Sequence, residues 1–98
     1  MYTVYILYSK ALDRYYIGQT MDINNRIEEH NSEKYDDSYT KRACDWRLYF
    51  SILCQNRTEA IKIEHHIKKM HSRVFLENLK RYPEISEKII AKYSNKKF

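Results

Sequence analysis

Gly18 is the only glycine among the 98 residues of this chain, which also contains a single proline. Glycine is needed where the backbone takes a positive φ, or where another group approaches the backbone too closely for a side chain. A chain that avoids glycine elsewhere is expected to meet one of these two requirements here. Because Gly18 follows Tyr16 and Ile17 directly, the constraint acts on a segment with strong β-preference.

Two segments around Gly18 predict a β-hairpin. Residues 2–8 and 15–20 are rich in aromatic and β-branched side chains, and a polar link separates them. Side chains alternate between the two faces of a strand, so Tyr16 and Gly18 share one face. We expect Tyr5 to share that face.

The segment after the hairpin predicts a short helix. Thr20 or Asp22 can cap its amino end, and the helix is expected to end near Asn31. Arg26 and His30 are four positions apart, so their side chains project from the same side of this helix. Without further context, Arg26 is expected to pair in solvent with Asp22, four residues earlier.

A longer helical pattern begins near Asn56. Asn56 and Glu59 have the three-residue spacing of a capping box. At about 100° per residue, Glu64 lies on the inward side of this helix, where a carboxylate needs a partner. Pairing with Lys68, four residues later, satisfies this need. The apolar residues that recur at helical spacing and define the expected buried stripe are Ala60, Ile63, Ile67 and Met70.

The remaining segments alternate between loop, strand and helix. Residues 32–45 are polar with little periodicity and are expected to form a mobile loop, and residues 46–53 predict a third strand. Residues 72–81 predict a short helix, and Pro83 precedes a last amphipathic helix over residues 84–93. No repeats or low-complexity tracts accompany these elements.

Length and charge limit the classes of protein that this chain can represent. At 98 residues with 43% hydrophobic side chains, one domain with one core is expected. The formal charge is +5, and residues 57–98 hold eleven Lys and Arg against five Glu. This basic part suits nucleic acid or an anionic membrane surface, and solvated helix faces explain the charge equally well. No stretch is long enough for a membrane span and the start lacks a signal peptide, so we expect a cytoplasmic protein that does not act at a membrane.

Several of these residues stand in a characteristic order along the chain: Val4-Tyr5-Ile6, Tyr16-Ile17-Gly18, Arg26, His30 and Glu64. Over about residues 2–80 this order resembles the GIY-YIG nuclease superfamily, and within it the small stand-alone members similar to the nuclease domain of nucleotide-excision-repair incision subunits. The resemblance implies an α+β fold in which helices flank a small three-stranded antiparallel sheet. It also implies one domain over residues 1–98, with a core at about 2–80 and a helical extension at about 83–95.

The resemblance further implies a metal-dependent endonuclease that hydrolyses phosphodiester bonds in DNA, with structure-selective or weak sequence specificity. Tyr5 would position or activate the attacking water, and Tyr16 would hydrogen-bond the water or the phosphate. Arg26 would stabilise negative charge on the phosphate, and His30 would assist by a hydrogen bond. Glu64 would hold a single Mg²⁺ or Mn²⁺ ion.

Other positions have structural or binding roles in this resemblance. Gly18 would let the backbone pack closely, together with the strand residues Val4, Ile6 and Ile17. Val4 replaces the leading glycine of the family pattern, and Gln19 stands where many relatives carry a lysine. The residues expected to contact nucleic acid are Lys68, Lys69, Arg73, Gln19 and Asn78.

Two further functions compete with this interpretation. The absence of a lysine at position 19 favours a nucleic-acid-binding module that keeps the fold but has little catalysis, and such a module would bind in a salt-sensitive way. RNA is an alternative substrate, because the expected catalytic groups contact phosphate rather than the sugar. The sequence leaves the oligomeric state open and allows a partner protein that supplies targeting.

Overall fold

The computed structural model describes residues 1–32, 42–70 and 72–94. The elements along the chain are β1 (Tyr2–Ser9), β2 (Arg14–Thr20), α1 (Ile23–His30), β3 (Arg47–Cys54), α2 (Arg57–Met70), α3 (Arg73–Arg81) and α4 (Pro83–Tyr93). The strands form one antiparallel sheet in the order β2-β1-β3. The predicted fold class is therefore confirmed. Most of the loop expected over residues 32–45 lies outside the described residues.

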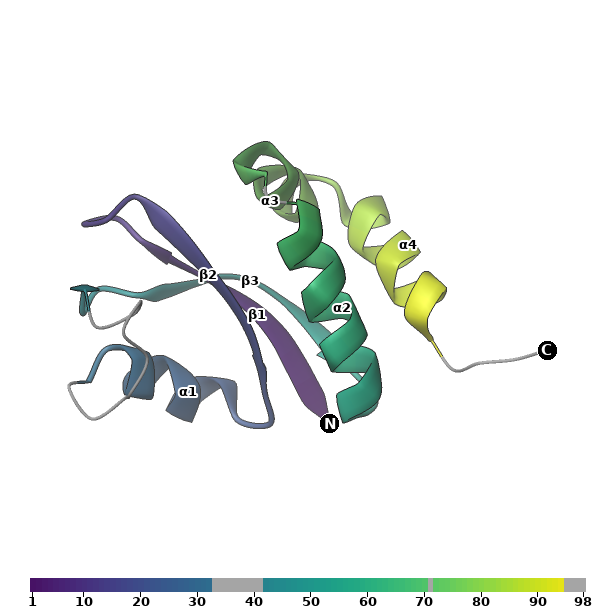
Figure 1. Cartoon of the computed structure of the whole chain (residues 1–98), viewed down its shortest axis with the longest axis horizontal. Coiled ribbons are helices and arrows are strands. Elements are labelled where there is room, and N and C mark those ends of the chain that lie inside the picture. Colours follow the sequence, from purple (N-terminus) through teal and green to yellow (C-terminus); the bar gives the residue numbers. More distant parts are fainter. Residues whose placement is uncertain (33–41, 71, 95–98) are drawn as a thin grey trace.

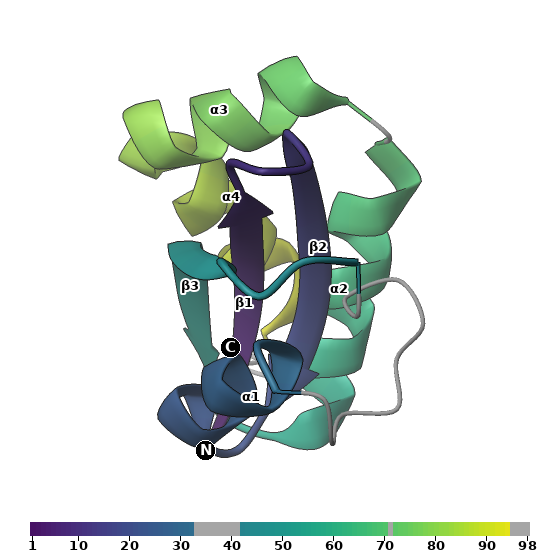
Figure 2. The same ribbon diagram turned by 90° about the vertical axis from the view of Figure 1, so that its left-hand side faces the viewer.

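Helices cover both faces of the sheet (Figure 1). α1 lies on one face, and α2, α3 and α4 lie on the other. The view turned by 90° shows α1 in front of the strands, α2 beside the edge strand β2, and α3 across the end of the β1–β2 hairpin (Figure 2). None of the helices in the described ranges is long and apolar enough to cross a membrane.

The central strand β1 contributes side chains to both layers. Val4 and Ile6 belong to an aliphatic core with α2, α3 and α4, whereas Tyr5 and Leu7 pack with Trp46 on the α1 side. All four β1 residues are at most 1% exposed. A strand that is covered on both faces has an apolar side chain at every position, which explains the continuous run in the sequence.

Side-chain caps fix where the helices begin. Asp22 caps α1, because the backbone N–H of Asn25 donates to its carboxylate at 3.1 Å. Asn56 accepts from the backbone N–H of Glu59 at 2.9 Å and so caps α2. The expected buried stripe of α2 is wrong in one residue: Met70 is 46% exposed, because the helix ends there.

The hairpin turn is tied to the start of α3. Asp13 adopts a left-handed φ of 51°, a conformation that Asp tolerates better than most residues. Its carboxylate accepts hydrogen bonds from Tyr8 at 2.6 Å and from Arg73 at 2.8 Å. The Arg73 guanidinium also lies over the ring of Tyr15, 5.3 Å from its centroid. These contacts place the first turn of α3 beside β2.

Candidate active site

Tyr5, Tyr16 and His30 form a cluster on the α1 side of the sheet. The strand register pairs Leu7 with Tyr16, so Tyr16 shares the face of Tyr5 as predicted. The Tyr5 hydroxyl lies 2.8 Å from His30 Nε2, and both residues are only 1% exposed. The Tyr16 ring centroid is 4.7 Å from that of His30 and 6.3 Å from that of Tyr5. Residues far apart in the sequence thus meet in one aromatic cluster.

Gly18 makes room for this cluster. A Cβ atom at this position would lie 2.6 Å from the Tyr5 hydroxyl oxygen and 2.7 Å from Tyr5 Cζ, which is closer than real Cβ contacts come. The φ angle of Gly18 is not positive. Close approach, rather than an unusual backbone conformation, therefore explains why this position needs glycine. The missing side chain allows the Tyr5 ring to lie over β2 and reach His30.

Asn31 holds the end of α1 against the start of β3. Its amide donates to the Trp46 carbonyl at 2.9 Å, and the Trp46 N–H donates to the Asn31 side-chain oxygen at 2.7 Å. Trp46 is 2% exposed, and its ring meets Tyr16 edge-on with centroids 6.4 Å apart. This pair of hydrogen bonds fixes the helix end that carries His30. The sequence indicated Asn31 only as the helix end, and no local pattern marks its long-range contact.

Arg26 lies one helical turn before His30. Its Nε is 3.1 Å from a carboxylate oxygen of Glu29, and its side chain is 32% exposed. Residues four apart share a side of an α-helix, so a partly exposed cation lies beside the buried end of the cluster. The carboxylate that this contact involves belongs to Glu29, three residues later, whereas the sequence favoured Asp22, four residues earlier.

Glu64 is mostly shielded on α2, in agreement with its expected inward position. Its side chain is 14% exposed, and Oε2 lies 2.6 Å from the Lys68 ammonium, whose side chain is 49% exposed. Lys68 and Tyr16 line the same cleft. Glu64 is not part of the cleft lining, and its contact with Lys68 is the link between this carboxylate and the cleft.

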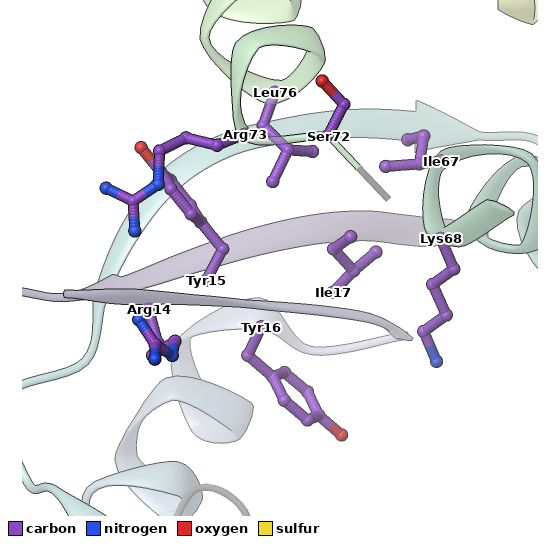
Figure 3. A pocket seen from close by; sticks show the side chains of 9 residues that line it. All are labelled: Arg14, Tyr15, Tyr16, Ile17, Ile67, Lys68, Ser72, Arg73 and Leu76. Atoms are coloured by element: carbon purple, nitrogen blue, oxygen red, sulfur yellow. The ribbon is translucent and has the colours of Figure 1, made fainter. Parts of the chain in front are cut away.

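The cleft has a volume of about 580 Å³ and opens between β2 and the helices α2 and α3 (Figure 3). In this view Arg14 and Tyr16 extend below β2, whereas Tyr15 and Ile17 extend above it toward the helices. The sequence does not predict Arg14 and Tyr15 as site residues, although the alternation of side chains along a strand places them on opposite faces of β2. The complete lining is Arg14, Tyr15, Tyr16, Ile17, Ile67, Lys68, Ser72, Arg73 and Leu76.

Two of the expected nucleic-acid contacts lie away from the tyrosine cluster. Gln19 is opposite Val4 in the strand register and therefore faces the aliphatic core, where its side-chain oxygen is buried. Asn78 lines a second cleft together with Tyr49. Lys69 is exposed on α2.

Tyr15, on the helix side of β2, is held in its protonated form. Burial, followed by the neighbouring Tyr49, raises the pKa of Tyr15 to about 12. Its hydroxyl therefore stays protonated at neutral pH and is a poor candidate for a base. Hydrogen bonds from Arg73 and then from Tyr8 lower the pKa of Asp13 below its ordinary value, so this carboxylate remains charged at the hairpin turn.

The residues of the site fit a divalent cation held by one carboxylate. Among the described residues, no three His, Cys, Asp or Glu side chains gather into a metal-binding group. Mg²⁺ often uses only one or two carboxylates and completes its shell with waters and substrate phosphates. Glu64 is a hard oxygen donor whose partner Lys68 lines the cleft, and an i,i+4 helical pair is worth only about 0.5 kcal/mol. A cation can replace so weak a partner.

Comparison with known proteins agrees with the resemblance found in the sequence. Residues 1–80 match the family model described as the GIY-YIG catalytic domain. A UPF0213 protein of Syntrophus aciditrophicus (strain SB) is 36% identical over 69 residues, which cover 70% of this chain and 79% of that protein. A UPF0213 protein of Desulfotalea psychrophila (strain LSv54 / DSM 12343) is 38% identical over 55 residues, which cover 56% of this chain and 50% of that protein. No solved structure matches the chain significantly.

Proposed function

This chain belongs to the GIY-YIG catalytic domain family, and on this basis we propose that it is an endonuclease that uses one divalent cation to hydrolyse phosphodiester bonds in DNA. The main support is the buried hydrogen bond between Tyr5 and His30. The His30 ring packs against Tyr16, which lines the same cleft as Lys68. A core built for packing alone has little need of a buried hydroxyl that requires a glycine opposite it.

The burial of Tyr5 determines how it acts in this proposal. A hydroxyl on a residue that is 1% exposed reaches the attacking water through a relay with His30 and Tyr16 rather than directly. Tyr16 is partly exposed and presents its own hydroxyl to the substrate. Histidine accepts and releases protons near neutral pH, so His30 suits the middle of such a relay.

The charged residues act on the phosphate. The Arg26 guanidinium binds the phosphate oxygens as negative charge grows on them. Glu64 holds Mg²⁺ or Mn²⁺, which stabilises the charge of the departing oxygen when bound. Lys68 balances the Glu64 charge in the absence of the cation. Arg26 thus acts on the phosphate directly, and Glu64 acts through the cation that it would hold.

Contacts to the sugar-phosphate backbone of the nucleic acid supply most of the affinity in this proposal. The basic side chains on α2 and α3 bind phosphates, and such contacts carry no direct sequence information. We therefore expect selection by the shape of the nucleic acid, such as branches, flaps or single strands, rather than by base sequence.

Cleavage of labelled oligonucleotides tests the proposal. Purified protein is incubated with duplex, flap and single-stranded DNA, and with a matched RNA, in Mg²⁺, Mn²⁺ or EDTA. We expect cleavage of DNA only with a cation, and a loss of about 100-fold or more in Glu64→Gln and Arg26→Ala. Glu87→Gln, on an exposed part of α4, removes the same charge elsewhere and should cleave normally. Full activity of both site variants would refute the site.

A binding module on the same fold is the second candidate. The observations that favour it are the Glu64–Lys68 pair, which occupies the proposed metal ligand, and the glutamine at position 19. This function predicts binding that weakens steeply with salt and no cleavage under any of the conditions above. Binding that is insensitive to salt would exclude it.

A further inference from the structure

The cleft beside Tyr16 contains more apolar surface than phosphate binding requires. Ile17 from β2, Ile67 from α2 and Leu76 from α3 line it, and Ile67 and Leu76 are 1% and 7% exposed. Contacts to a phosphate backbone need cations and hydrogen-bond donors, not an aliphatic floor. The floor therefore indicates that an apolar part of a ligand enters the cleft.

Cations also border the cleft. Arg14, Lys68 and Arg73 come from three different elements and all line the cleft. Lys68 and Arg73 each pair with a carboxylate, and their side chains remain 49% and 44% exposed. The Arg73–Asp13 pair is exposed on both sides and therefore weak, and the Lys68 side chain is half exposed, so a phosphate can approach both cations. The volume of about 580 Å³ lies within the range of small-ligand sites.

We infer that this cleft holds one unpaired nucleotide of the substrate, next to the phosphodiester bond that the tyrosine cluster faces. Its base contacts Ile17, Ile67 and Leu76, and its phosphate contacts the cations at the rim. The inference rests on the proposed endonuclease function and adds a substrate class to it. The preferred substrate is a strand from which one base can leave the helix beside the cut.

The combination of charge and floor favours a nucleotide over other ligands. A base inside a duplex has both faces covered by its neighbours, so it must leave the stack before it can enter a pocket. An acidic peptide would use the cations but would not need a flat apolar floor. Aromatic rings that stack on bases are common in sites for unpaired strands, and Tyr16 lies at the edge of this cleft.

Methyl NMR in EDTA tests the inference without cleavage. Protein labelled at Ile and Leu methyl groups is titrated with a thymidine trinucleotide, with the same trinucleotide lacking its central base, and with inorganic phosphate. We expect shifts at Ile17, Ile67 and Leu76, and about tenfold weaker binding of the abasic ligand. Ile85 and Ile89 line a separate groove beside α4 and serve as internal controls.

A charge-reversal pair tests the rim. Arg14→Glu and Lys88→Glu change the same charge at exposed positions, but only Arg14 lines the cleft. We expect Arg14→Glu to weaken trinucleotide binding about tenfold and Lys88→Glu to weaken it less than twofold.

Equal affinity for the intact and abasic ligands, or shifts confined to Ile85 and Ile89, would overturn the nucleotide pocket. Cleavage that persists alongside such a result would leave the endonuclease function standing. Methyl shifts at the cleft in a protein that never cleaves would instead support the pocket and remove the catalytic proposal. The two inferences therefore fail separately.

Discussion

A tyrosine–histidine hydrogen bond of 2.8 Å occurs on each side of the sheet, and the two have different surroundings. Tyr5 and His30 lie on the α1 side and are 1% exposed. Tyr93 and His66 join α4 to α2 and are both partly exposed. The first pair packs against Tyr16, whereas the second borders a groove that Lys88 and Lys92 also line.

The difference teaches that surroundings, not hydrogen-bond length, separate a candidate catalytic pair from a structural one. The inner pair needs a glycine opposite the Tyr5 ring and packs against Tyr16, which lines the cleft that also contains Arg14, Lys68 and Arg73. The outer pair holds a terminal helix in place. The expected effects of substitution therefore differ in kind: activity depends on the inner pair, and the attachment of α4 depends on the outer one.

Removing each tyrosine hydroxyl is expected to give the largest contrast. Tyr5→Phe should lower the cleavage rate by about 100-fold or more, because it breaks the proposed relay. Tyr93→Phe removes a bond of the same length and chemistry on the other side and should leave the rate unchanged. Single-turnover cleavage of a labelled strand in Mn²⁺ measures both. Equal rates in the two variants would show that the inner pair is only structural.

The aliphatic layer should show the opposite behaviour. Ile63 is fully buried on α2, so Ile63→Ala is expected to lower the free energy of unfolding by about 3 kcal/mol. The cleavage rate of the molecules that remain folded should not change. Urea denaturation and the cleavage assay measure these two quantities, and Leu53→Ala, at a position 61% exposed on β3, is the control. A lower cleavage rate in folded Ile63→Ala than in Leu53→Ala would contradict the claim that the aliphatic layer serves stability and not activity.

Gly18→Ala should displace the Tyr5 ring by a steric clash. The new methyl group would meet Tyr5, so we expect the free energy of unfolding to fall by about 2 kcal/mol. Because the Tyr5 hydroxyl oxygen is the nearest atom at 2.6 Å, adding Tyr5→Phe should relieve part of this cost, while Cζ at 2.7 Å preserves the rest. A double-mutant cycle by urea denaturation measures the coupling. Strictly additive effects would mean that the two residues do not meet.

The outer pair should give the smallest effect, and one that depends on pH. Burial, followed by Lys92 and Lys69, lowers the pKa of His66 in the folded protein. In the unfolded protein the histidine has a pKa of about 6.5, so it binds a proton at a higher pH than it does in the folded protein. The free energy of unfolding therefore falls as the pH drops below about 6.5. The loss levels off below the folded pKa. His66→Gln should reduce the decrease in unfolding free energy between pH 7.5 and 5.5, and His65→Gln should not. The same pH dependence in wild type and His66→Gln would contradict this origin.

Local patterns predicted much of the fold. Alternation along the strands placed Tyr5 and Tyr16 on one face, and helical spacing placed Glu64 on the inward side of α2. Capping residues predicted where helices begin, because a cap depends on a side chain and a backbone group only three residues apart.

Contacts between distant residues could not be predicted in the same way. The Tyr5–His30 bond requires α1 to dock at one angle, which the Asn31–Trp46 hydrogen bonds across fifteen residues help to fix. The cleft forms because Arg73 reaches Asp13 across sixty residues. The periodicity of the sequence does not predict these contacts, because they depend on how the folded helices and strands pack against one another.

Anomalous diffraction from crystals soaked in Mn²⁺ tests the central claim most directly, namely that Glu64 and the tyrosine cluster serve one phosphodiester-cleaving site. The account predicts an ion about 2.1 Å from a Glu64 carboxylate oxygen, with the Lys68 ammonium moved away and the Tyr16 hydroxyl on the same cleft. An ion bound only elsewhere, with the Glu64–Lys68 pair intact at saturating Mn²⁺, would contradict it.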